Sequence, residues 1–211
     1  DIQHFREKVN KSFRTVTLQD LQDYSDSLRN QDYAPTTIKR MLCAVKSLFS
    51  FGHHIGYLQF DIGKPLRIPT PKETISERIL SQEEVFYMFE CAKNPRDRML
   101  LKLLYYSGLR VSEISSLRWS NLQKRDKTGQ ITVQTKGSKT NVILLPVHFW
   151  DELCGFRRGA GEEAPIFKSR KGNALCVGQI QRIVSRVALK AGITGNVSPH
   201  WLRHSHASHA L

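Results

Sequence analysis

One proline-bearing stretch constrains the fold of this chain more than any other feature. KPLRIPTPKETISERIL, residues 64–80, contains three prolines and shows neither helical nor alternating periodicity. Proline cannot continue a helix and cannot donate to the hydrogen-bond ladder of a strand, so regular elements should end at this stretch. We therefore expect a linker here and two domains, residues 1–75 and residues 76–211.

The segment before this linker has the pattern of helices. Thr17 and Asp20 form the T-x-x-D pattern of a capping box, and leucines follow it at helical spacing. After a turn at residues 32–35, apolar residues recur through residue 55 as the stripe of a second helix. Three basic residues lie largely off that stripe, on what is either an ordinary solvated face or a face that meets phosphate: Lys39, Arg40 and Lys46.

The segment after the linker begins with helices and then changes its period. Ser81 and Glu84 form a second capping box, and the apolar helix RDRMLLKLLYYSG ends at Gly108, a residue that favours a left-handed cap. A short helix, VSEISSLRW, comes next. GQITVQT and NVILLP alternate instead, and the turn KGSK between them completes the pattern of a β-hairpin.

Helical periodicity returns in the last third of the sequence. Residues 147–158 and 178–192 have apolar residues at helical spacing, and Ser198 with Pro199 begins a final helix. The whole order predicts a mainly α fold with a small β-hairpin or sheet. The first domain should be helical and the second should be α+β.

The charge of the chain indicates a polyanionic partner. It has 32 Lys and Arg residues against 19 Asp and Glu residues, a net charge of +13. Residues 1–75 carry a net charge of +3 and residues 76–211 one of +10. Nucleic acid is the commonest polyanionic partner, and the alternative is a protein that is merely basic. We expect the second domain to meet more phosphate than the first.

Composition also argues against several classes of protein. No apolar run approaches the roughly 20 residues that span a bilayer, and the first residues, DIQHFREKVNKSF, do not form a secretory signal. We therefore expect a cytoplasmic protein without a membrane partner. Reduced thiols are expected for the four cysteines, which lie far apart and form no CxxC pair: Cys43, Cys91, Cys154 and Cys176.

Two short motifs contain cations suited to phosphate chemistry. In SGLRVSE, Arg110 follows a helix end between apolar neighbours, so a rigid joint can hold it for a bidentate grip on an anion. Alternatively, Arg110 caps the carbonyl groups at the end of the preceding helix. In TKGSKT, Lys136 and Lys139 flank a turn, where a lysine either donates a proton to a neighbouring site or only adds charge to the surface.

A third motif, SPHWLRH, adds an imidazole and a guanidinium. His200 and Arg203 share a face in the first turn of the last helix, where the helix N-terminus favours an anion. His204 has the spacing of a metal pair with His200, but no glutamate or cysteine accompanies it, and Arg203 places a cation beside it. We expect no metal ion here, and packing or capping roles for His206 and His209.

These motifs occur together, and in an order that resembles one protein family. SGLRVSEISSLRW, then a hairpin with TKGSKTNVILLP, then SPHWLRHSHASHAL resembles the catalytic domain of tyrosine recombinases, the phage integrase family. APTTIKRMLCAVKSLFSFGHHIGYL with the proline-bearing linker resembles the family's helical core-binding domain. The resemblance covers nearly the whole chain. It departs from the family at His206, where an apolar residue is more usual.

The resemblance implies a DNA strand exchanger that uses no metal and no cofactor. A tyrosine attacks the scissile phosphate, forms a 3′-phosphotyrosyl link and releases a 5′-hydroxyl. Carried over to this sequence, Arg110 and Arg203 hold the non-bridging oxygens, and Glu113 holds Arg110 or His200 in place.

The same resemblance assigns the proton transfers. Lys136 is the general acid for the departing 5′ oxygen, and Lys139 is the alternative because the register of the hairpin is open. His200 is the general base or proton relay, and His204 matches a common family residue. Further contacts with double-stranded DNA are expected from five residues: Lys39, Arg40, Lys46, Lys139 and His204.

Two parts of the family pattern are missing from these 211 residues. The family continues with a G-H-x pattern, which carries a second histidine or a tryptophan, and then with the tyrosine nucleophile. All six tyrosines here precede SPHWLR, and Tyr105 and Tyr106 lie in an apolar helix as core residues do. DIQHFREKV also resembles the back half of the first core-binding helix. We expect a C-terminally truncated recombinase that binds DNA and cannot cleave it.

Two other functions fit parts of this pattern. A type IB topoisomerase-like enzyme shares the catalytic groups but relaxes supercoils alone, and a truncated relative could regulate by occupying DNA sites without cutting. His200 in the H-x-x-R motif and the helical first domain favour the recombinase. For that function the resemblance implies two domains that clamp the duplex and a homotetramer on DNA. An RNA-binding domain fits less well, because the sequence has no RNP1-like aromatic motif.

Overall fold

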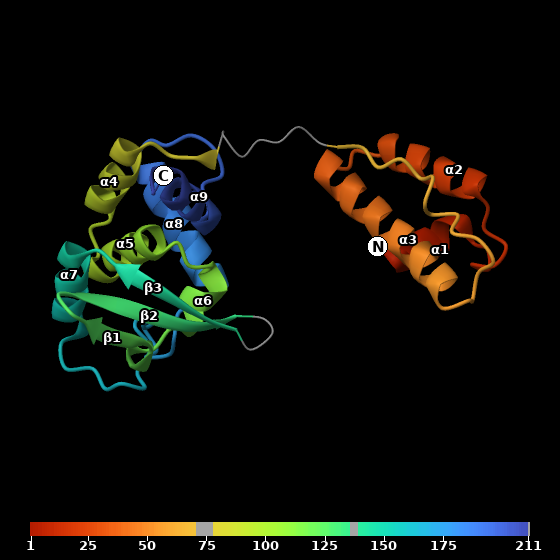
Figure 1. Ribbon diagram of the computed structural model, residues 1–211. Helices are drawn as coiled ribbons and strands as arrows, with labels where there is room; N and C mark the ends of the chain where they lie inside the picture. Colours follow the sequence, from red (N-terminus) through yellow and green to blue (C-terminus); the bar gives the residue numbers. More distant parts are fainter. Residues whose placement is uncertain (71–77, 136–138, 211) are drawn as a thin grey trace. The chain divides into compact units, whose positions relative to one another are not determined.

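The computed structural model describes residues 1–70, 78–135 and 139–210, apart from the side chains of Thr135 and Lys139. The chain divides into two compact units, Asp1–Glu73 and Thr74–Leu211 (Figure 1). The boundary that we expected at residue 75 lies outside the described residues. Each unit has a hydrophobic core of its own.

The described part of the first unit consists of three helices around an aromatic core: α1 (Ile2–Val9), α2 (Leu18–Arg29) and α3 (Pro35–His54). Phe5 on α1 is fully buried, and its ring meets Phe49 of α3 edge-on at 5.8 Å and Tyr24 of α2 at 4.9 Å. Burial of large aromatic side chains from all three helices is what makes so short a segment compact.

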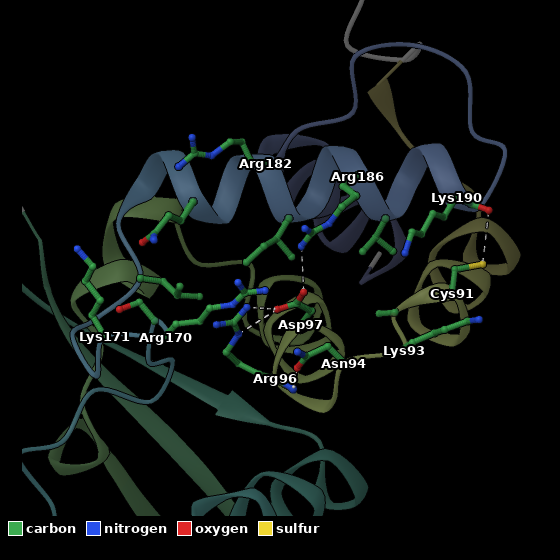
Figure 2. A pocket seen from close by; sticks show the side chains of 16 residues that line it. Cys91, Lys93, Asn94, Arg96, Asp97, Arg170, Lys171, Arg182, Arg186 and Lys190 are labelled. Carbon is green, nitrogen blue, oxygen red and sulfur yellow. Dashed lines mark hydrogen bonds and ion pairs between the residues drawn. The ribbon is translucent and has the colours of Figure 1, made fainter.

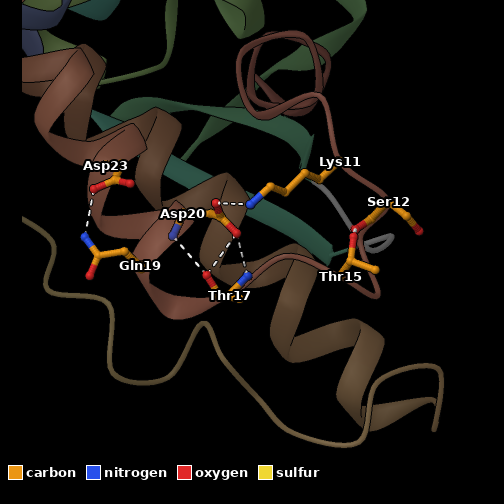
Figure 3. A network of polar contacts seen from close by, with 7 residues as sticks. All are labelled: Lys11, Ser12, Thr15, Thr17, Gln19, Asp20 and Asp23. Carbon is orange, nitrogen blue, oxygen red and sulfur yellow. Dashed lines mark hydrogen bonds and ion pairs between the residues drawn. The ribbon is translucent and has the colours of Figure 1, made fainter.

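The second helix begins at the predicted capping box (Figure 3). The Asp20 backbone N–H donates to Thr17 Oγ1 at 3.3 Å, and the Thr17 N–H donates to the Asp20 carboxylate at 2.9 Å. The Lys11 ammonium also donates to this carboxylate, at 2.6 Å. These bonds to Lys11 and Thr17 lower the pKa of Asp20 from 3.8 to about 2. The sequence prediction of this cap is confirmed.

The second unit combines helices with a three-stranded antiparallel sheet, in the order β1-β2-β3. Its described elements, in chain order, are α4 (Gln82–Cys91), α5 (Pro95–Ser107), α6 (Val111–Ser116), the 3₁₀ turn Trp119–Asn121, β1 (Leu122–Arg125), β2 (Thr128–Thr135), β3 (Lys139–Leu145), α7 (Val147–Arg157), α8 (Val177–Lys190) and α9 (Pro199–His209).

The apolar helix α5 is the centre of this unit. It packs against α4, α7, α9 and β3, so it is buried on most sides, as its nearly continuous apolar sequence requires (Figure 1). Helix α7 lies against β2, where a Cβ on Gly129 would come within 1.9 Å of the Trp150 ring. Glycine at this position therefore lets α7 approach the strand closely.

The predicted fold class, mainly α with a small sheet, is confirmed, with two local differences. The expected hairpin gains the strand β1, which pairs with β2 from Leu122↔Ile131 to Arg125↔Thr128. Strand β1 was not predicted because its sequence, LQKR, is short and mostly polar. The short helix expected to reach Trp119 ends at Ser116, and a 3₁₀ turn follows it.

Two further observations concern the class of protein. All four cysteines are free thiols. Among the residues that the structure describes, no helix combines the length and the apolar character that crossing a membrane requires.

Candidate active site and basic pocket

The corner between α5 and α6 presents Arg110. Helix α5 ends at Ser107, and its C-cap residue Gly108 has a φ of 57°, in the left-handed region where glycine is favoured. Leu109 is 2% exposed and fixes the corner in the core. Arg110 is the N-cap of α6: its N–H donates to Glu113 Oε2 at 2.7 Å, and its Nη1 donates to Glu113 Oε1 at 3.2 Å. Glu113 thus orients Arg110, whose side chain stays 57% exposed.

Helix α9 brings Arg203 to the same corner. Its Nη1 donates to the backbone carbonyl of Gly108, an acceptor at the helix end that has no partner within α5. The sequence left open whether Arg110 caps the carbonyls of α5. In the structure Arg203 makes such a bond, and Arg110 points to Glu113 instead.

The two arginines line one cleft of about 250 Å³. Its other polar lining residues are Ser107 of α5, Glu113 of α6, Asn141 of β3 and His206 of α9. A guanidinium group has five N–H donors in a fixed fork, so two of them in one small cleft suit a tetrahedral oxyanion such as phosphate. Residues far apart in the sequence therefore form one anion-binding arrangement.

His200 does not line the cleft that contains Arg110 and Arg203. His200 is exposed in the first turn of α9, and its ring lies 6.4 Å from that of His204. Among the described residues that line the cleft, the imidazole is that of His206 and not that of His200. Burial lowers the pKa of His206, and the positive charge of Arg203 lowers it further.

The structure does not decide whether Lys136 or Lys139 of the hairpin is the general acid. Lys136 lies outside the described residues, and Lys139 begins β3 with a side chain outside the description. The assignment of the general acid therefore stays a prediction. Asn141, two residues after Lys139, shows that this strand does lead into the cleft.

The other residues predicted to bind DNA lie in the first unit. Lys39 is exposed on α3. Arg40 forms an ion pair with Asp1. Lys46 Nζ donates to the carbonyls of Lys64 at 3.0 Å and Leu66 at 3.2 Å, which fastens the chain that follows α3 back onto that helix. Lys46 thus already has a structural role, and contact with DNA remains a prediction for all three.

Tyr105 and Tyr106 belong to the core, as their apolar surroundings predicted. Tyr105 is 6% exposed, and its hydroxyl is hydrogen-bonded to His209 Nδ1 at 2.9 Å. The Tyr106 ring lies 4.9 Å from that of Phe149. Burial raises the pKa of both tyrosines, so both stay protonated near neutral pH.

A larger and strongly basic pocket, of about 680 Å³, lies between α8 and the start of α5 (Figure 2). Asp97 is the one acidic residue of its described lining, and its side chain is 8% exposed. It pairs with Arg96 at 2.7 Å and with Arg186 at 3.2 Å. Seven cationic residues line the pocket: Lys93, Arg96, Arg170, Lys171, Arg182, Arg186 and Lys190.

This pocket was not predicted from the sequence, although the sequence contains part of the pattern that forms it. Arg182, Arg186 and Lys190 follow one another at intervals of four residues, so they form one stripe of α8 along the edge of its buried apolar face. A basic stripe alone is an ordinary solvated surface. Only the folded chain shows that the loops carrying Lys93 and Arg170 bring their cations to the same stripe.

Comparison with family models covers most of the chain. The model of the "Phage integrase family" matches residues 78–211, and that of the "Phage integrase, N-terminal SAM-like domain" matches residues 1–54. Among curated proteins, the tyrosine recombinase XerC of Xanthomonas campestris pv. campestris (strain B100) is 32% identical over 184 residues. That match covers 84% of this chain and 56% of the relative, so the chain spans little more than half of that protein.

Solved structures show the same fold. The XerH site-specific recombinase bound to its difH substrate has a TM-score of 0.72 at 21% identity, over 94% of this chain and 61% of that one. A lambda integrase tetramer bound to a Holliday junction has a TM-score of 0.72 at 17% identity, over 93% and 60% of the two chains. At these identities the likeness concerns the fold alone.

Proposed function

Because this chain belongs to the phage integrase family, we propose that it is part of a site-specific recombinase that cuts and rejoins DNA strands by transesterification. The observation that carries the proposal is the cleft in which Arg110 and Arg203 meet. The corresponding substrate is one phosphodiester of a DNA duplex, and no metal or cofactor is assigned to the reaction.

The two arginines act on the charge of the reacting phosphate. Arg203 holds its position through the Gly108 carbonyl and Arg110 through Glu113, which leaves further N–H groups of each fork for the non-bridging oxygens. Negative charge grows on these oxygens as the nucleophile attacks. Fixed donors aimed at such charge commonly contribute about 3 kcal/mol each to the stability of a transition state.

The proposed reaction also includes the nucleophilic attack and two proton transfers. A tyrosine oxygen attacks phosphorus, the bond from phosphorus to the 5′ oxygen breaks, and a 3′-phosphotyrosyl link forms. Lys136, with Lys139 as the alternative, gives a proton to the departing 5′ oxygen, and His200 takes the proton of the tyrosine or relays it. Tyr105 is not the nucleophile in this scheme because it is buried and bonded to His209.

The basic pocket supports DNA as the substrate. Its seven cations against one paired acid give the second unit a strongly positive surface besides the cleft. Duplex DNA carries one negative charge for each 1.7 Å or so of its axis, so such a surface holds it largely through phosphate contacts and counterion release. Binding should therefore weaken steeply as salt increases.

We also propose that the protein works as a homo-oligomer on DNA in the cytoplasm. Lambda integrase, which has the same fold, has been solved as a dimer bound to a core site and as a tetramer bound to a Holliday junction. By likeness to that protein, two to four copies would assemble on one DNA target.

A nicked duplex substrate tests the reaction. A form of the protein that contains the tyrosine nucleophile should form a covalent adduct at the 3′ side of one phosphate, and Tyr→Phe substitution should abolish it. The 211-residue chain itself should bind the duplex without forming the adduct. An adduct formed by the 211 residues alone would contradict this assignment of the nucleophile.

Two further assays separate the alternatives. Relaxation of a supercoiled plasmid that lacks a specific site, by a monomer, would identify a type IB topoisomerase-like enzyme. Sequence-specific binding without an adduct in every form of the protein would identify a DNA-binding regulator.

A further inference from the structure

His206 lines the cleft, and neither the resemblance nor the proposed reaction assigns it a role. Its imidazole lies between α9 and the corner at Gly108, where it lines the cleft. A partly buried polar ring calls for a reason in its contacts.

The ring of His206 is wedged against the end of α5. A Cβ on Gly108 would lie 2.5 Å from His206 Cδ2 and 3.1 Å from His206 Nε2, so the imidazole rests directly on the Gly108 backbone. The ring also meets Tyr105 edge-on, with centroids 6.3 Å apart and an interplanar angle of 89°. His206 therefore fits only because residue 108 has no side chain.

Two residues of α9, one turn apart, hold this corner. Arg203 donates to the Gly108 carbonyl, and His206 covers the Gly108 backbone. Arg110 lies two residues after Gly108, as the N-cap of α6, so the backbone conformation at Gly108 sets the direction of its side chain. The position of Arg110 relative to Arg203 therefore depends on how α9 seats against Gly108.

The imidazole offers something that a phenyl ring of similar shape lacks. A ring nitrogen can donate or accept a hydrogen bond, and His206 Nε2 lies toward the Gly108 backbone, 3.1 Å from where a Cβ would stand. Carbonyls in the last turn of a helix have no partner within it. Burial and the charge of Arg203 favour the neutral ring, which adds no third positive charge next to the two arginines.

We propose that His206 is a positioning residue: its imidazole holds the Gly108 corner against α9, so that Arg110 and Arg203 grip the same phosphate. The role rests on the proposed function only in taking that anion to be a DNA phosphate. His206 acts through the arginines and takes no part in proton transfer.

Inorganic phosphate tests the geometry without any cleavage. In the 211-residue chain, the ¹⁵N guanidinium resonances of Arg110 and Arg203 should shift together on titration, with a single dissociation constant. His206→Phe should raise that dissociation constant about tenfold, because misplacing a phosphate-binding group by about 1 Å is costly. His206→Gln should leave the dissociation constant within about threefold of that of the unsubstituted chain. His209→Phe is the matched control, since it removes an imidazole from the same helix and from Tyr105 but outside the cleft lining.

The outcomes are distinct. Unchanged phosphate binding in His206→Phe, or equal weakening in His206→Phe and His206→Gln, would overturn the proposal. If a thermal melt shows that His206→Phe does not fold, His206→Leu takes its place in the comparison. In an adduct-forming version of the protein, His206→Phe should slow adduct formation about tenfold at unchanged DNA affinity. A phosphate grip that depends on His206 in a protein that never forms an adduct would contradict the proposed function and support the positioning role.

Discussion

The two ends of helix α5 carry cationic sites of opposite character. At its C-terminal end, the cleft of about 250 Å³ holds two arginines, each fixed by a bond to the protein. At its N-terminal end, the pocket of about 680 Å³ gathers seven cations around one paired acid. Helix α5 has 13 residues, so the two sites are about 18 Å apart along it at 1.5 Å per residue.

The difference indicates how one domain can separate chemistry from affinity. A small cleft with oriented donors acts on one phosphate, because only fixed geometry distinguishes a transition state from its ground state. A wide basic pocket adds attraction to any phosphates within reach, which increases affinity without selecting a bond to be broken. The helix between the sites is buried on most sides and is suited to keep their distance constant.

The largest expected effect comes from the cleft. Arg110→Lys keeps the charge but removes the fork that grips two oxygens, so adduct formation should fall about 100-fold or more, while DNA affinity changes less than about twofold. Rates of adduct formation at saturating DNA, with separate binding curves, measure the two quantities. Equal losses of rate and affinity would show that the cleft binds without selecting the transition state.

The basic pocket should show the reverse pattern. Arg182→Gln, Arg186→Gln and Lys190→Gln together should weaken duplex binding about 10- to 100-fold and reduce the slope of log affinity against log salt by up to about 3. The rate at saturating DNA should stay unchanged. Fluorescence anisotropy over a salt series measures the slope.

A matched control for the pocket comes from three exposed cations outside its lining: Lys124, Arg125 and Lys127. Their replacement by glutamine removes the same charge from the same unit. If this control reduced the affinity as much as the pocket variant does, net charge alone would explain the effect.

The corner that links α5 to the cleft predicts a smaller effect on stability. Gly108→Ala should destabilise the second unit by about 2 kcal/mol, because alanine is strained at a φ of 57° and its Cβ meets His206. Gly172→Ala should cost only about 1 kcal/mol, since that glycine has a φ of 84° but nothing within 4 Å of its Cβ. Urea unfolding of both variants measures the difference, and equal costs would show that contact with His206 is unimportant.

The smallest effect concerns the first unit. Because the pKa of Asp20 is lowered to about 2 in the folded chain, its contribution to the stability of α2 is fully present above pH 3.8 and is lost as the pH falls through about 2. Amide hydrogen exchange in α2 across this range should show the loss, and Asp20→Asn should remove its pH dependence. Lys11→Gln should move the Asp20 pKa, followed by carboxyl ¹³C shifts, back toward 3.8.

The sequence by itself determined most helices, both capping boxes and the glycine corner. These features depend on residues three or four positions apart, as in Thr17 with Asp20 and Ser81 with Glu84, so local spacing is sufficient to predict them. The motifs around Arg110 and Arg203 could also be recognised in the sequence. The excess of positive charge in residues 76–211 predicted that the second domain binds phosphate.

Only the tertiary structure decided which side chains meet. The pairing of Arg203 with the Gly108 carbonyl, the place of His206 in the cleft and the convergence of seven cations on the basic pocket join segments tens of residues apart. Helical spacing put His200 and Arg203 on one face, but the packing of α9 on α5 placed His206 in the cleft lining. Strand β1 is short and polar, and pairing with β2 defines it. Periodicity fixes which face of an element is apolar, whereas the partner of that face depends on how distant elements pack.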